Sequence, residues 1–334
     1  MSAPRKICVV KLGAIGDVVN ALPLVNRLRA GIPEAKISWV IAPLAHALVD
    51  GHPAVDEFLL LDIKRRASWP AFLRHLRAQK FDLVLDLQRI LKSGIITRLS
   101  GAPRRLGFDR ARCKELSWWF TNERIANNPK PGVTVAQYLE FGDALGLPAV
   151  DPSWDLPITP WTHAPPLVSL GIGASKPSNL WPTQRWSQLL RELATQLGAQ
   201  HLALVGGPGD RELASQILSQ APTGILNTVG TLDLKQTAGL LAASSHFVAC
   251  DTGPLHMAVA TGTGVTALFG AADPLRTGPF AHASDVIYHP AECSPCRKRL
   301  CFVEGHPCMH NIEVDEVAQR ILARVKQAGV ESAS

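Results

Sequence analysis

The sequence has little of what marks a disordered or fibrous chain. Charged residues make up only 19% of the 334 residues, hydrophobic residues make up 46%, and no low-complexity or collagen-like segment occurs. Such a composition supplies enough apolar surface to offset the conformational entropy that is lost on folding. With roughly 150 residues per domain, the length predicts about two globular domains.

Two common nucleotide-binding motifs are also missing. The glycine turn after the first apolar run contains neither G-x-x-x-x-G-K-[ST] nor a full G-x-G-x-x-G. This absence argues against nucleoside-triphosphate hydrolysis and against nicotinamide binding. No recognition helix or RNA-binding motif accompanies the basic residues, so we expect no nucleic-acid partner.

Signals for secretion and for membrane insertion are weak as well. The first apolar run, residues 7–12, is interrupted by Lys11 and is not followed by a small-residue cleavage site. The longest charge-free stretch, residues 252–272, contains repeated Gly and Thr and is better interpreted as a buried helix followed by a strand. Seven cysteines, four of them in residues 293–308, do not resemble a secreted disulfide framework. We therefore expect a cytoplasmic protein in a reducing compartment.

Positive charge is concentrated in the first half of the chain. Residues 1–150 contain 22 Lys and Arg against 13 Asp and Glu, whereas residues 151–334 contain 12 against 15. The first half should therefore attract an anionic partner. Nucleic acid, an anionic lipid surface and a phosphorylated substrate all satisfy this asymmetry, and charge alone does not choose among them.

Apolar, β-branched runs recur between segments with helical periodicity. Runs with so little alternation are typical of parallel strands that are buried on both faces. The pattern predicts two doubly wound α/β domains, with ligands beyond the carboxyl ends of the strands and a cleft between the domains. The expected strands are 7–12, 37–42, 58–63, 81–87, 167–172, 201–205, 246–250, 265–269 and 286–288.

A proline-rich segment, residues 147–160, predicts the boundary between the domains because it resists both helix and central strand. We expect an N-terminal domain over residues 1–155 and a C-terminal domain over residues 156–334. The last periodic segment, residues 314–325, predicts a helix that packs on either domain, including back on the N-terminal one.

The turn after the first strand opens a helix and carries an acidic residue, Asp17. Glycines in this turn, Gly13 and Gly16, let a ligand approach the backbone closely. A carboxylate at a helix N-terminus stays ionised and can accept a proton from a hydroxyl group. The alternative interpretation is that Asp17 only caps the helix.

The segment Val-Ala-Cys-Asp-Thr-Gly-Pro-Leu-His, residues 248–256, predicts an anion site between a strand and a helix. Pro254 suits the first helical turn, where its missing N–H has no consequence. The hydroxyl of Thr252 and the following amides could hold a diphosphate, and Asp251 could hold sugar hydroxyls. His256 is either a buried structural histidine or a phosphate or sugar contact.

Taken together, five motifs in order resemble the ADP-heptose:lipopolysaccharide heptosyltransferases of glycosyltransferase family nine. They are K-L-G-A-I-G-D (11–17), D-L-V-L-D-L-Q (82–88), G-G-P-G-D (206–210), D-T-G-P-L-H (251–256) and F-G-A-A-D-P (269–274). The resemblance covers nearly the whole chain. It implies a GT-B fold, with two Rossmann-like domains, and an inverting transfer of heptose from ADP-heptose to an inner-core sugar of lipopolysaccharide that needs no metal cofactor.

The resemblance also implies roles for single residues. Asp17 matches the catalytic base. Ser175, Gly206, Asp251, Thr252, Gly253 and His256 match the donor-binding segments, while Gly16, Lys92 and Arg112 match acceptor-binding positions. Cations at the acceptor positions suit the phosphates and carboxylates of the lipopolysaccharide inner core.

One donor position departs from the family pattern. Relatives commonly carry Lys two residues before the Trp-Pro that follows the expected strand 167–172, and this chain has Asn179 there. The leaving diphosphate needs stabilisation by amides, hydroxyls and a cation. We expect Lys176 or Arg185 to supply the charge, or helix dipoles to carry more of it.

Two further features leave alternatives open. Residues 64–77, with Arg65 and Arg66, predict a basic amphipathic helix that rests on the anionic inner face of the inner membrane or simply packs on its own domain. Cys293, Cys296, Cys301 and Cys308 have spacing that suits a structural zinc or iron site, or they are reduced thiols in a loop.

The leading functional hypothesis is therefore a heptosyltransferase of the lipopolysaccharide inner core. The acceptor could instead be a protein or another glycan, and a nucleotide-sugar epimerase or a catalytically silent sugar-nucleotide-binding protein are further alternatives.

Overall fold

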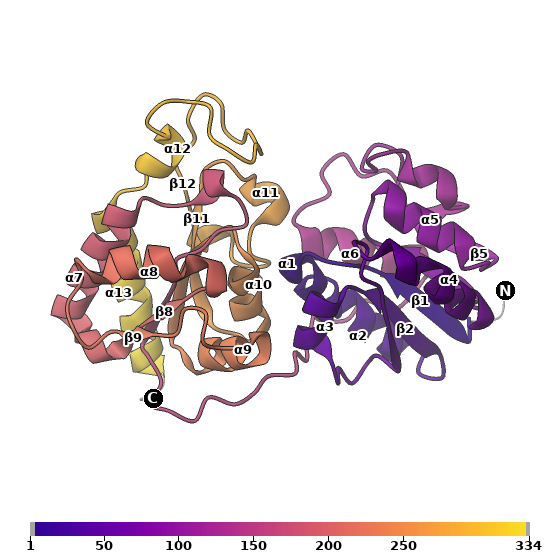
Figure 1. The fold of residues 1–334 in the computed structure, drawn as a ribbon, viewed down its shortest axis with the longest axis horizontal. Coiled ribbons are helices and arrows are strands. Elements are labelled where there is room, and N and C mark those ends of the chain that lie inside the picture. The colour runs from indigo at the N-terminus through magenta and orange to yellow at the C-terminus, as the bar shows by residue number, and fades with distance from the viewer. Residues whose placement is uncertain (1–3, 332–334) are drawn as a thin grey trace. The chain divides into compact units, whose positions relative to one another are not determined.

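The computed structural model describes residues 4–331 and divides into two compact units, with the division after Pro157. Each unit contains one parallel six-stranded sheet covered by helices (Figure 1). The α/β class with buried parallel strands, predicted from the apolar runs, is confirmed.

The sheet of the first unit has the order β3-β2-β1-β4-β5-β6. Its strands are β1 (Lys6–Val10), β2 (Lys36–Ile41), β3 (Glu57–Leu60), β4 (Leu83–Asp86), β5 (Arg104–Gly107) and β6 (Glu123–Arg124). The helices are α1 (Ile15–Val19), α2 (Leu22–Gly31), α3 (Pro43–Val49), α4 (Trp69–Ala78), α5 (Leu91–Leu99) and α6 (Thr134–Ala144), with 3₁₀ turns η1 (Arg66–Ser68) and η2 (Ser117–Phe120).

The second unit repeats this arrangement in the order β12-β11-β10-β7-β8-β9. Its strands are β7 (Val168–Gly171), β8 (Leu202–Val205), β9 (Leu226–Asn227), β10 (His246–Cys250), β11 (Gly264–Phe269) and β12 (Val286–Tyr288). The longer helices are α7 (Thr183–Leu197), α8 (Arg211–Leu218), α9 (Leu234–Ala243), α10 (Gly253–Ala260) and α13 (Val314–Glu331); α11 (Pro274–Thr277), α12 (Pro307–His310) and the 3₁₀ turns η3 (Pro177–Asn179), η4 (Ala199–His201), η5 (Pro208–Asp210) and η6 (Ala283–Asp285) are short.

In both units the strand order reverses beside the first strand of the unit. The neighbours at this point are β1 and β4 in the first sheet, and β7 and β10 in the second. Parallel α/β sheets bind ligands at such a switch point, beyond the carboxyl ends of the two strands. The topology therefore marks one candidate ligand site in each unit.

The last helix, α13, is part of the core of the second unit, one of the two domains on which the sequence allowed it to pack. It contacts α7, β10 and β11, and Val317 and Ile321 are fully buried in the core cluster that also contains β7 and β8. The charge-free stretch 252–272 forms α10 and β11. None of the helices between residues 4 and 331 combines the length and the apolarity that a membrane-spanning helix needs.

Candidate functional site

The switch point of the first unit places Asp17 beside a buried lysine. Lys11 follows β1, and its Nζ donates a hydrogen bond of 2.8 Å to Oδ2 of Asp17. The Lys11 side chain is only 2% exposed, whereas that of Asp17 is 40% exposed. Asp17 is the third residue of α1, and the N-cap is Ala14, whose side chain forms no cap hydrogen bond. Asp17 therefore lies in the first turn of α1 but is not its N-cap residue.

Charge attraction keeps Lys11 protonated despite its burial. Burial alone lowers the pKa of a lysine, but attraction to Asp17 and to Tyr138 outweighs it and raises the pKa of Lys11. Nζ also lies 5.6 Å from the ring centroid of Tyr138, on α6. The pair leaves a partly exposed carboxylate next to a fixed positive charge, which favours the ionised carboxylate as a proton acceptor.

The end of β4 supports the same site. Gln88 accepts a 3.0 Å hydrogen bond from the backbone N–H of Leu12 through Oε1, which ties the two loops at the switch point together. Asp86 is 3% exposed, and burial raises its pKa to about 6, although Ser93 Oγ and the N–H of Gln88 donate to its carboxylate. The sequence motif 82–88 predicts no role for either side chain.

The three acceptor candidates lie in different surroundings. Gly16 is buried in α1, and Lys92 is exposed on α5. Arg112 is almost buried, and it forms ion pairs with Asp109 and, at 2.8 Å, with Glu140. Burial opposes its charge, but these two carboxylates outweigh that effect and raise the pKa of Arg112. Its Nη1 is buried and has no hydrogen-bond partner within the described part of the chain.

At the switch point of the second unit, the loops after β7 and β10 meet. The backbone N–H of Ser175 donates to the carbonyl of Asp251 over 3.2 Å. Gly206 follows the adjacent strand β8, and a Cβ there would lie 3.0 Å from Oδ2 of Asp210. The carboxylate of Asp210 is in turn fixed by the N–H of Gly207 at 2.8 Å. Ser175, Gly206 and Asp251 thus follow the carboxyl ends of three adjacent strands, where parallel α/β sheets bind ligands.

Asn179, the position that departs from the family pattern, bridges two of these residues. Its Nδ2 donates to Ser175 Oγ at 3.3 Å and to Asp251 Oδ2 at 3.2 Å. The side chain is 3% exposed, and Oδ1 has no hydrogen-bond partner among residues 4–331. The sequence indicated that this position is unusual but not that it connects the two loops.

The loop that carries Asn179 is clamped by the cysteine-rich segment. Ser178 donates from Oγ to the carbonyl of Lys298 at 2.6 Å, and its own carbonyl lies 2.8 Å from Nε2 of His306. Lys176 Nζ donates to the carbonyl of Arg297 at 2.9 Å. These contacts fix the loop between β7 and α7.

Of the two cations expected to replace the family lysine, Arg185 is engaged elsewhere. It pairs with Glu313 at 3.0 Å and donates to the carbonyl of Ile312, both next to the start of α13. Lys176 is on the donor loop itself, and its ammonium group retains donors beyond the one given to Arg297.

The remaining donor candidates lie at the start of α10. Thr252 is the N-cap, its side chain forms no cap hydrogen bond, and Gly253 is the first helical residue. Pro254 lies in the first turn, as predicted. His256 is 6% exposed on the same helix. Backbone N–H groups in the first turn of this helix and the hydroxyl of Thr252 suit an anionic oxygen.

The predicted metal site is not assembled. Over residues 4–331, no three His, Cys, Asp or Glu side chains lie where they could hold a metal ion. Cys301 is exposed and donates to the carbonyl of Val303, whereas Cys308 is 3% exposed and belongs to the core. Cys8 and Cys250 lie in the cores, as expected, and burial raises the pKa of Cys250 to about 12.

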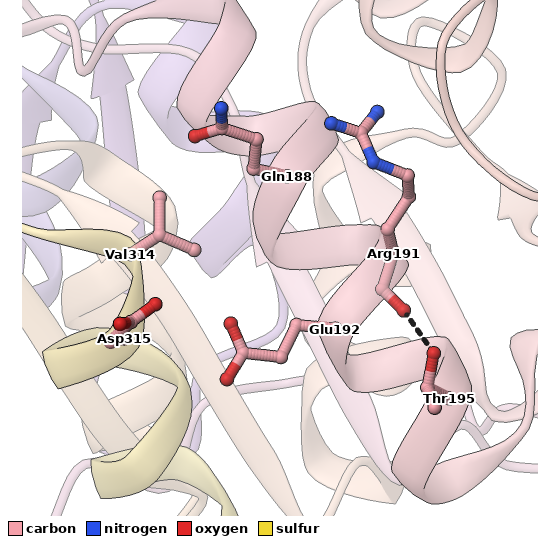
Figure 2. A pocket seen from close by; sticks show the side chains of 6 residues that line it. All are labelled: Gln188, Arg191, Glu192, Thr195, Val314 and Asp315. Atoms are coloured by element: carbon pink, nitrogen blue, oxygen red, sulfur yellow. Dashed lines mark hydrogen bonds between the residues drawn. The ribbon is translucent and has the colours of Figure 1, made fainter.

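A separate surface hollow of about 500 Å³ lies between α7 and the start of α13 (Figure 2). Its lining includes Glu192 and Asp315, and burial together with Asp315 raises the pKa of Glu192. No candidate donor or acceptor residue lines this hollow.

Comparisons with known proteins place the chain in a family. The family model described as glycosyltransferase family 9 (heptosyltransferase) matches residues 69–306. The lipopolysaccharide core heptosyltransferase OpsX of Haemophilus influenzae is 25% identical over 302 residues, which cover 85% of this chain and 84% of that protein.

Solved structures share the fold over almost the full length. A family 9 glycosyl transferase from Veillonella parvula has a TM-score of 0.80 and 20% identity, covering 97% of both chains. The ADP-heptose lps heptosyltransferase II of Escherichia coli has a TM-score of 0.78 and 23% identity, covering 96% of this chain and 99% of that one. The GT-B fold implied by the sequence resemblance is confirmed, and the chain belongs to glycosyltransferase family 9, the heptosyltransferase family.

Proposed function

We propose that this glycosyltransferase moves heptose from ADP-heptose to an inner-core sugar of lipopolysaccharide with inversion at the anomeric carbon. The observation that carries the proposal is the ion pair of Lys11 and Asp17 at the switch point of the first unit. The hydrogen-bonded cluster of Ser175, Asn179 and Asp251 lies at the switch point of the second unit and supports it. A relative named as a lipopolysaccharide core heptosyltransferase and a structural neighbour named for ADP-heptose support the substrates.

In the proposed division of labour, residues 1–155 bind the acceptor and residues 156–334 bind the donor. Gly16, Lys92 and Arg112 contact the acceptor, whose phosphates and carboxylates suit the basic first half. Ser175, Lys176, Gly206, Thr252 and Gly253 hold the diphosphate, while Asp251 and His256 hold the heptose hydroxyls.

In the proposed reaction, the carboxylate of Asp17 takes the proton of the acceptor hydroxyl as that oxygen bonds to the anomeric carbon. The bond from this carbon to the phosphate oxygen breaks, and its electron pair stays on ADP. Attack opposite the leaving group inverts the configuration. Hydroxyl and amide donors near Ser175 and Thr252 stabilise the charge that develops on the diphosphate.

The test is ADP release from ADP-heptose, with and without heptose-free core acceptors. We expect release only with an acceptor, and a loss of at least about a hundredfold in kcat for Asp17→Asn, because general-base catalysis typically contributes that much or more. Release without an acceptor would point to an epimerase or a hydrolase instead. ADP-heptose binding without release with any glycan or protein acceptor would point to a silent binding protein.

We also propose an electrostatic contact of the first unit with an anionic membrane surface. Trp69, Phe72 and Leu73 of α4 pack against the unit's own core, while Arg65 and Arg74 remain exposed. Such a contact would rest on charge rather than on inserted side chains. Vesicles with anionic lipid should therefore pellet the protein, and Arg65→Glu with Arg74→Glu should reduce this. Equal pelleting with neutral vesicles would refute the proposal.

A further inference from the structure

An amide side chain lies buried between two loops of the second unit, and its hydrogen-bonding groups are used unevenly. Both donated hydrogen bonds of Asn179 go to donor-site residues, Ser175 and Asp251. Its carbonyl oxygen Oδ1, in a side chain that is 3% exposed, has no partner among residues 4–331. A buried acceptor without a partner carries a free-energy cost, so this orientation needs a reason.

The reason lies in Asp251. An ionised carboxylate only accepts hydrogen bonds, so the amide must present its NH₂ group, and not its oxygen, to Oδ2 of Asp251 at 3.2 Å. The second amide hydrogen then points to Oγ of Ser175 at 3.3 Å. The orientation of Asn179 is therefore fixed by chemistry, and Oδ1 is left without a partner as a consequence.

This orientation determines what Ser175 can do. A serine hydroxyl has one hydrogen, and its oxygen here already accepts from Asn179. The hydroxyl hydrogen must therefore point away from Asn179. Ser175 is exposed, so this hydrogen can be donated to a ligand that carries an acceptor, and a phosphate oxygen is a strong one.

The surrounding contacts keep the amide in place. Next to Asn179, Ser178 is 1% exposed and is bonded to Lys298 and to His306. Two residues later, Trp181 is 1% exposed and donates from Nε1 to the carbonyl of Ile312 at 3.1 Å. The loop is held on both sides of Asn179, so the polarity of the Ser175 hydroxyl is set before a ligand arrives.

We propose that Asn179 is a positioning residue that directs the Ser175 hydroxyl as a donor toward the diphosphate of the sugar nucleotide and holds Asp251 as an acceptor for sugar hydroxyls. This inference rests on the proposed function. A neutral amide at this position gives direction to two hydrogen-bonding groups but adds no charge to the site.

A double-mutant cycle with Asn179→Leu and Ser175→Ala tests the proposal, with ADP affinity measured by calorimetry. A hydrogen bond to a charged group is worth about tenfold to a hundredfold in affinity. We expect each single variant to bind ADP at least about tenfold more weakly. The double variant should be no weaker than the weaker single variant, because Asn179 acts on phosphate through Ser175.

Asn179→Asp is the sharper variant, because it keeps the side-chain shape. Its carboxylate can no longer donate to Ser175, repels Asp251, and turns the serine hydrogen inward. We expect ADP affinity to fall by at least about tenfold, while the exposed Asn311→Asp, a matched control in the same unit, leaves it unchanged.

Additive losses in the cycle, or an Asn179→Asp variant within twofold of the parent protein, would overturn the inference. Melting curves distinguish the proposed positioning role from a purely structural one. In a purely structural role, the melting temperature falls while the ADP affinity of the folded protein is kept. If the parent protein binds neither ADP nor ADP-heptose, the proposed function itself fails, and this result is distinct from the others.

Discussion

Lys11 is the side chain through which the charge of Asp17 can be altered without touching Asp17 itself. Replacing it with Met keeps the length of the buried chain but removes the cation 2.8 Å from Oδ2. An opposite charge at this distance favours the ionised form of a carboxylate. We expect the loss of Lys11 to move the acid-side midpoint of the pH–rate profile for ADP release to higher pH.

Other titratable groups also face this pair and define the control. Tyr138 lies on α6, and Asp86 lies at the end of β4 and interacts with Lys11. Tyr138→Phe should leave the acid-side midpoint in place. Lys11→Arg keeps the positive charge and should therefore shift the midpoint less than Lys11→Met does. An unchanged profile in Lys11→Met would show that Lys11 is only a packing residue.

Asp86 predicts a pH dependence of stability. Burial raises its folded-state pKa to about 6 from an ordinary 3.8. Between these two pH values, Asp86 holds a proton in the folded state that it releases in the unfolded state. The contribution of this proton to the free energy of unfolding is therefore present at low pH and is lost as the pH rises through about 6. We expect the free energy of unfolding of Asp86→Asn, measured relative to the parent protein, to increase by up to about 3 kcal/mol as the pH is raised from 4 to 7.

Urea unfolding of the two proteins at both pH values measures this difference. Asp151→Asn, which removes an exposed carboxylate from the same unit, is the matched control and should show little change with pH. A difference between Asp86→Asn and the parent protein that is constant with pH would contradict the burial argument.

At the scale of single residues, the sequence predicts which positions gather at a site better than it predicts their partners. Asp17 and Asp251 follow strands that the apolar runs mark, so their place at a sheet edge follows from topology. The 2.8 Å bond to Lys11 and the bridge through Asn179 depend on the path of each turn, which spacing does not encode. The spacing of Cys301 and Cys308 likewise does not indicate that the first is exposed and the second belongs to the core.

At the scale of elements, the loop 175–179 depends on the segment 297–306 for its shape. Ser178→Ala removes the 2.6 Å hydrogen bond from a buried hydroxyl to the carbonyl of Lys298. We expect a loss of about 0.5–1.5 kcal/mol in unfolding free energy. Because the loop also carries Ser175 and Asn179, ADP affinity should fall as well.

The control for this prediction is Ser219→Ala, at the end of α8, whose hydroxyl hydrogen bond to Gln216 lies on the surface. Thermal unfolding and calorimetric ADP titrations of both variants provide the comparison. If Ser178→Ala binds ADP as the parent protein does, the clamp stabilises the fold without shaping the donor loop.

Strands that consist of strong apolar runs can be predicted from the sequence more reliably than short edge strands can. Residues 246–250 and 286–288 are predicted with their observed bounds, whereas β5, β6 and β9 are missed. β6 and β9 have two residues each and lie at sheet edges, and β5 begins with two arginines. Pairing with a neighbouring strand forms these elements, so local composition does not indicate them.

At the scale of the whole molecule, two units with the same strand order carry different chemistry. The first is basic and contains the Lys11–Asp17 pair, and the second contains the Ser175–Asn179–Asp251 cluster. Repetition of the fold explains why the motifs fall at equivalent strand ends, but it does not determine which ligand each unit takes. That assignment depends on side chains, and it can be tested by ligand addition.

Hydrogen exchange with ADP alone tests this assignment across residues 4–331. A ligand that binds only the folded state stabilises by about 2.7 kcal/mol at a concentration of 100 times Kd. We expect slower exchange in the second unit, strongest in residues 171–179, 206–210 and 250–257, because these loops contain the proposed diphosphate contacts. Residues 11–17 should be unaffected until an acceptor is added. Protection by ADP that is strongest at residues 11–17 would reverse the assignment of donor and acceptor, since that loop lies at the switch point of the first unit.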